Sequence, residues 1–149
     1  MAIYEFTIDG LALVAATPKT VLEIASGATD RVKIVSWWVE FDGATSTAVP
    51  VKVEVGRFSA GVTTATTITE LKLDPAEGAP AAVVKHSTTT EGAGTPETGI
   101  ETHRIHPQGG MFVQAPLGRE KVLAVSTFWR IRCTAAAGVN VTAGYNREE

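Results

Sequence analysis

The three histidines are the side chains whose type most readily suggests chemistry, because imidazole is a common metal ligand and general base. His103 and His106 lie three positions apart, and His86 precedes a threonine-rich stretch. In a strand, side chains three positions apart point to opposite faces, so His103 and His106 could not share one ion. We therefore predict no metal centre, provided that the segment around them is extended.

The other reactive groups also have structural explanations. Cys133 alternates with Trp129 and Ile131, as expected for a thiol on the buried face of a strand. The chain has no Gly-x-Ser-x-Gly motif, and the glycines of residues 91–99 lack the lysine and following helix of a phosphate-binding loop. The acidic residues are scattered, and no pair of them points to a hydrolase. We predict no catalytic residue and no cofactor.

Composition limits the remaining classes of function. The 149 residues are enough for one domain with a substantial core, and the 19% charged and 44% hydrophobic residues are ordinary for a globular protein. A net charge of −3 gives no electrostatic footprint for nucleic acid or for an anionic membrane. The single cysteine excludes an internal disulfide framework, and no signal-like or membrane-spanning stretch is seen. We expect a protein that acts without secretion.

The strand that organises the chain is expected at residues 31–42, RVKIVSWWVEFD, the densest β-branched and aromatic run. Its alternation shifts by one residue between Ile34 and Val35, so one face stays buried only if a β-bulge takes up the extra residue. The predicted inner set after the shift is Val35, Trp37, Val39 and Phe41. Trp38 points to the other face and needs cover, either from a second layer of this chain or from another subunit.

The rest of the chain also has the patterns of short strands. Tyr4, Phe6 and Ile8 share one face, which indicates an edge strand or, within residues 1–18, an N-terminal arm that reaches another subunit. Residues 57–99 are rich in Thr, Ala, Gly and Pro, and we expect mostly long loops there, with short strands at 68–73 and 81–86. No window favours an amphipathic helix. We predict one all-β domain over residues 1–149, an antiparallel β-sandwich of roughly eight to ten strands with a jelly roll as the leading topology.

Several stretches carry a family resemblance: KTVLEI (19–24), RVKIVSWWVEFDG (31–43), AVPVKVEV (48–55), LKLDP (71–75), PLGRE (116–120) and VNVTAGY (139–145). Together they resemble tailed-phage capsid decoration proteins, also called cement or minor capsid proteins, in particular those of actinobacterial and thermophilic siphophages. The resemblance implies a jelly-roll protomer, commonly a homotrimer, that sits on the outside of the capsid and braces neighbouring major capsid subunits. It implies no catalysis.

The expectation from the residues and the resemblance is a non-enzymatic virion protein, made in the host cytoplasm and located on the capsid exterior. Its partners would be the major capsid protein and two further copies of itself, with no nucleic acid and no membrane. The candidate interface residues are Tyr4, Phe6, Trp38, Phe58 and Arg119. The alternative is a carbohydrate-binding β-sandwich module that uses Trp38 and Phe58 as exposed aromatics; a cupin-like metal enzyme is less favoured.

Overall fold

The computed structural model describes residues 2–45, 47–91 and 94–149. Met1 of the predicted arm, and Gly92 and Ala93 of the predicted loop region, lie outside these residues. The described part of the chain forms twelve strands and no helix: β1 (Ile3–Leu13), β2 (Lys19–Ala25), β3 (Val32–Phe41), β4 (Val51–Phe58), β5 (Thr64–Ile68), β6 (Leu71–Lys72), β7 (Val83–Thr90), β8 (Glu101–Ile105), β9 (Gly110–Gln114), β10 (Lys121–Leu123), β11 (Phe128–Thr134) and β12 (Val139–Glu148). Accordingly, these residues include no helix able to cross a membrane.

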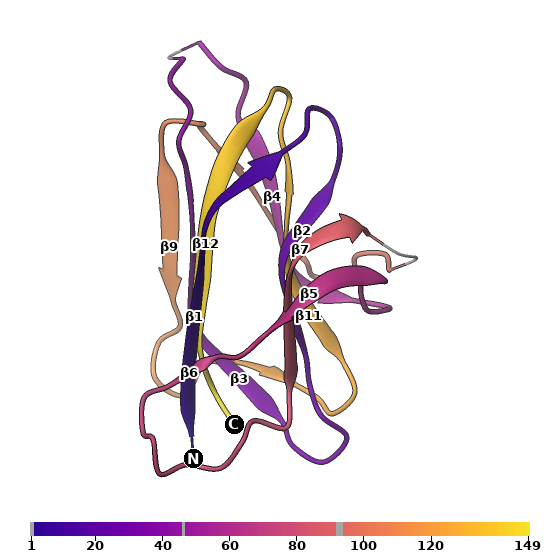
Figure 1. Ribbon diagram of the computed structural model, residues 1–149, viewed down its shortest axis with the longest axis vertical. Helices are drawn as coiled ribbons and strands as arrows, with labels where there is room; N and C mark the ends of the chain where they lie inside the picture. The colour runs from indigo at the N-terminus through magenta and orange to yellow at the C-terminus, as the bar shows by residue number, and fades with distance from the viewer. Residues whose placement is uncertain (1, 46, 92–93) are drawn as a thin grey trace.

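The strands form two antiparallel sheets that face each other (Figure 1). Sheet A has the order β10-β3-β12-β1-β6, and β9 pairs with β3 beside β10 on the same edge. Sheet B has the order β5-β7-β2-β11-β4-β8. The predicted all-β sandwich is confirmed, with more strands than expected, and the jelly-roll topology stays a prediction.

The core lies between the inner faces of the two sheets, where period-two alternation places the large apolar side chains. On β4, Val51, Val53 and Val55 are fully buried, as their alternation with polar residues predicts. On β11, Trp129 and Cys133 are buried in the same cluster. Cys133 is a fully buried core residue, and burial, followed by the negative charges of nearby carboxylates, raises the pKa of its thiol well above the usual range.

The predicted bulge in β3 is confirmed. Opposite β12, Ser36 pairs with Asn146 and Ile34 pairs with Arg147, so Val35 is the extra residue. The inner face remains buried on both sides of it. The placement of Val35 in the inner set is wrong, because the bulged residue is displaced from the alternation and is half-buried, whereas Ser36, expected outside, is buried.

Two segments differ from the simplest prediction. Residues 57–99 hold three strands, β5, β6 and β7, of which β5 forms one edge of sheet B. The N-terminal segment is β1, which pairs with β12 of its own chain through most of its length and with the short β6 on its other side. The pairing of β1 with β12 shifts register between Ile8 and Leu11, and Asp9 and Gly10 lie at this irregularity. Gly10 has a positive φ of 64° there.

The two termini lie side by side at one end of the sandwich (Figure 1), and Arg147, close to the C-terminus, is buried. Arg147 is fully buried, and its Nε and Nη2 donate to the two carboxylate oxygens of Glu70 at 2.7 and 2.5 Å. Its Nη1 donates to Glu149 Oε2 at 2.9 Å, and the Tyr145 hydroxyl donates to Glu70 Oε1 at 2.7 Å. Glu149 Oε1 in turn accepts from the backbone N–H groups of Ala81 and Ala82. This cluster joins the segment between β6 and β7 to the C-terminal strand.

We expect Glu70→Ala to lower the free energy of unfolding by about 3–5 kcal/mol, because it leaves the buried Arg147 guanidinium without its main partner. Urea unfolding followed by tryptophan fluorescence measures the change. The matched control is Glu97→Ala, which removes the exposed Arg57–Glu97 pair at 2.8 Å and is expected to cost about 0–1 kcal/mol. Equal losses in the two variants would contradict the structural role of Glu70.

A second prediction concerns Tyr145, whose pKa is raised by burial and then by the charge and hydrogen bond of Glu70. Above a pH of about 10 the unfolded chain loses the phenol proton while the folded chain keeps it, so the free energy of unfolding falls as pH rises. Tyr145→Phe removes this contribution. Urea midpoints between about pH 9 and 11 are therefore expected to fall less steeply in the variant than in the wild type; parallel curves would refute the assignment.

Candidate functional site

The outer face of sheet A carries an exposed apolar margin along the β9/β10 edge. Phe112 on β9 lies opposite Trp38 on β3, and their rings stack with centroids 6.4 Å apart. Trp38 lies opposite Gly144 on its other side, where an added Cβ would collide with the indole ring. Trp38 is therefore half-covered by its own chain, and Phe112, which is 63% exposed, forms the outer part of the pair.

The same margin includes two more exposed apolar side chains. Val122 on β10 is 51% exposed, and Leu117, in the loop between β9 and β10, is 99% exposed. We call Trp38, Phe112, Leu117 and Val122 the apolar margin of sheet A. Scattered apolar residues are normal on a protein surface, but a group at one sheet edge that includes two aromatic rings is typical of a contact surface.

The loop that contains Leu117 is a turn held by its own hydrogen bonds. Arg119 N–H donates to the Pro116 carbonyl at 2.9 Å, and the Glu120 carboxylate accepts from Gly118 N–H at 2.9 Å. Backbone hydrogen bonds, its own and that from Gly118, lower the pKa of Glu120, so this carboxylate stays charged and holds the turn. Arg119 is exposed beside Leu117.

The predicted interface residues divide into surface and interior positions. Trp38 and Arg119 lie in or beside the apolar margin. Tyr4 is 2% exposed, and its hydroxyl donates to the Gly78 carbonyl. Phe58 is 1% exposed, and Phe6 is half-buried with its ring 5.7 Å from that of His86. Tyr4 and Phe58 thus contribute almost no exposed surface, since both pack within their own chain.

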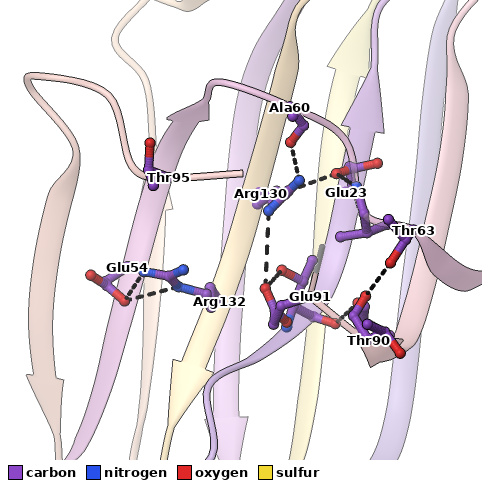
Figure 2. A network of polar contacts seen from close by, with 12 residues as sticks. Glu23, Glu54, Ala60, Thr63, Thr90, Glu91, Thr95, Arg130 and Arg132 are labelled. Carbon is purple, nitrogen blue, oxygen red and sulfur yellow. Dashed lines mark hydrogen bonds and ion pairs between the residues drawn. The ribbon is translucent and has the colours of Figure 1, made fainter. Parts of the chain in front are cut away.

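The outer face of sheet B holds a polar network that the sequence analysis missed (Figure 2). Arg130 on β11 points away from the core, yet it is fully buried. Its Nε donates to Glu23 Oε2 on β2 at 2.6 Å, and its Nη2 donates to the Ala60 carbonyl. Glu23 Oε2 also accepts from Val62 N–H at 2.9 Å. The ion pair therefore holds the segment between β4 and β5 over the sheet.

A second part of the network lies beside it. Arg132 donates through Nε and Nη2 to Glu54 Oε2 at 3.0 and 2.9 Å, and Lys52 donates to Glu54 Oε1 at 2.8 Å. Burial opposes ionisation of Glu54, but these hydrogen bonds outweigh it and hold the pKa of the carboxyl below its usual range. The Phe58 ring lies 4.7 and 4.9 Å from the guanidinium carbons of Arg130 and Arg132, which explains its burial.

Glu91 links the network to the end of β7. Its Oε2 accepts from the Thr20 hydroxyl at 2.8 Å, and its Oε1 accepts from Thr20 N–H. Glu91 Oε2 lies 4.0 Å from Arg130 Nη1, which is buried and makes no hydrogen bond to any of the described residues. The aligned charges on paired strands, Arg130 opposite Glu23 and Arg132 opposite Glu54, are the signal that could have indicated this network.

The histidines lie in separate surroundings. His103 points between the sheets, with its ring 5.8 Å from that of Trp37. His106 Nδ1 accepts from Gln108 N–H at 3.2 Å just after β8. Within residues 2–45, 47–91 and 94–149, no group of three or more His, Cys, Asp or Glu side chains could hold a metal ion.

Glu23→Ala tests whether the Arg130 pair holds the 59–63 segment. We expect a loss of about 3–5 kcal/mol in the free energy of unfolding, because Arg130 is left buried without its carboxylate. Amide hydrogen exchange at Val62, whose acceptor is removed, is expected to increase more than exchange at Ile131 in the core. Arg57→Ala serves as the exposed control. An equal increase at both amides would show that the segment is held by other contacts.

Comparison of the chain with protein-family models, with curated proteins and with solved structures found no match in any of the three. The features that support a functional proposal are therefore the apolar margin of sheet A, the polar network of sheet B and the resemblance of the sequence stretches described above.

Proposed function

We propose that the chain is a non-enzymatic structural protein of a phage virion that binds the outside of the capsid as a homotrimer and braces neighbouring major capsid subunits. The observation that carries the proposal is the apolar margin of sheet A. The resemblance to capsid decoration proteins supplies the partner, and a β-sandwich is the class of fold that this resemblance implies.

The margin has the chemistry of a protein contact. Aromatic side chains at the centre of an interface commonly supply much of its binding energy. Complete burial of a side chain such as Phe112, Leu117 or Val122 is worth about 1.5–3 kcal/mol relative to exposure. A contact of the usual size, about 1,600 Å², would extend beyond the margin onto neighbouring polar residues such as Lys33 and Gln114.

Many copies on one shell would add their contributions. Each subunit that bridges two capsid subunits converts the second contact into an intramolecular event, so even a modest contact stabilises the assembled shell. This role requires exposed apolar side chains that are held in fixed positions, and it requires no reactive group. Leu117 on its closed turn and the stacked Trp38–Phe112 pair meet this need.

The test is to mix purified protein with undecorated expanded capsids and to measure both binding and the temperature of DNA release. We expect saturable binding, a raised release temperature and at least tenfold weaker binding for Leu117→Asp, because the charge cannot be buried in an apolar contact. Val49→Asp is the matched control, since Val49 is 60% exposed and lies outside the margin.

The outcomes separate the parts of the proposal. No binding by the wild type would remove the capsid role, and saturable binding without a rise in release temperature would leave a surface-adhesion role. Equal loss of binding in Leu117→Asp and Val49→Asp would place the contact elsewhere. Light scattering after size-exclusion chromatography measures whether the trimer forms in solution.

A further inference from the structure

We propose that a cavity beside the polar network of sheet B binds an acidic sugar through its carboxylate and hydroxyl groups. The cavity has a volume of about 560 Å³, within the range of about 300–1,000 Å³ that is usual for ligand sites. It lies where β2 begins and β7 ends, and the polar side chains that line it are those of Thr17, Lys19, Thr88, Thr89, Glu91 and Arg132. This inference is independent of the capsid proposal.

A buried donor that makes no hydrogen bond to the described residues lies beside two residues of the cavity wall. Arg130 is fully buried, and its Nη1 is the one nitrogen of its guanidinium without a hydrogen bond among the described residues. The two groups beside this atom are Glu91, at 4.0 Å, and Gly94, where an added Cβ would lie 3.0 Å from Nη1. Both residues line the cavity, and Figure 2 shows the guanidinium directed toward Glu91. Since an unmet charged donor is costly, a ligand oxygen at this wall would be stabilised.

The charge around the cavity favours a single negative group. Within the network, three cations meet three carboxylates and balance them: Lys52, Arg130 and Arg132 against Glu23, Glu54 and Glu91. Lys19 lines the cavity, where its Nζ donates to the Ala12 carbonyl at 3.0 Å, and it adds one further positive charge there. The Glu91 carboxylate is occupied by the two donors of Thr20, so its charge is already partly compensated. Arg132, which lines the cavity and is 15% exposed, is the cation best placed to meet a ligand carboxylate.

The rest of the lining suits a sugar. Thr89 at the end of β7 is exposed and offers a hydroxyl that donates and accepts, as sugar hydroxyls do. Val14, 63% exposed, and Pro18 form an apolar wall against which the C–H face of a pyranose ring would pack. A carboxylate, several hydroxyls and one apolar face together describe a uronic acid or a similar acidic residue of a glycan.

The experiment titrates ¹⁵N-labelled protein with methyl β-D-glucuronide and, separately, with methyl β-D-glucoside. We expect the glucuronide to shift the amide signals of cavity residues such as Thr89 and Gly94, with a dissociation constant at least tenfold lower than that of the uncharged glucoside. Arg132→Gln is expected to weaken glucuronide binding at least tenfold, while Glu54 keeps its hydrogen bond from Lys52.

Two further variants distinguish a loss of ligand binding from a loss of folding. Thr89→Val, at an exposed position, is expected to weaken binding about threefold, the loss of one hydrogen bond to a ligand hydroxyl. Lys121→Gln removes a cation that pairs with Glu101 and does not line the cavity, and is expected to leave binding unchanged. Absence of shifts at cavity residues, equal affinity for both glycosides, or full affinity in Arg132→Gln would overturn the proposal, whatever the result with capsids.

Discussion

The buried arginine–carboxylate pairs are the interaction on which the arrangement of this protein depends. Two sheets can bury their inner faces against each other, but the irregular segments that connect them have little apolar surface of their own. Arg130 and Arg147 are both fully buried, and each binds a carboxylate from a distant part of the chain. A buried charge is stable only when its partners are all in place, so these pairs couple the position of the connecting segments to the sheets.

The connecting segments cover the outer faces of the two sheets unequally. On sheet B, the segment at 59–63 lies over Arg130, residues 95–97 pair with the backbone at the end of β4, and a polar cavity remains beside them. On sheet A, no described segment covers Phe112, and Trp38 is covered only in part. One face therefore leaves apolar side chains exposed, and the other has a cavity lined in part by charged and hydroxyl groups.

Much of the strand pattern could be predicted, because alternation is a local property of the chain. The valines of β4 and the bulge after Ile34 follow from period two alone. The strand β5 was hidden, since Thr64 to Ile68 is a short edge strand whose exposed positions are threonines and show no alternation. Of the predicted interface residues, Trp38 and Arg119 lie at the surface. The network around Arg130 was not predicted, because a polar side chain on the outer face of a sheet is usually exposed to solvent.

The sequence by itself determined the fold class, the position of the bulge and the buried face of the main strands, since each follows from residue type and short-range spacing. Only the tertiary structure decided which outer face is covered. The contacts that decide it join residues far apart in the chain, 107 positions for Glu23 and Arg130 and 77 for Glu70 and Arg147. No local pattern encodes such a pairing, because it exists only after the strands have taken their order in the sheets.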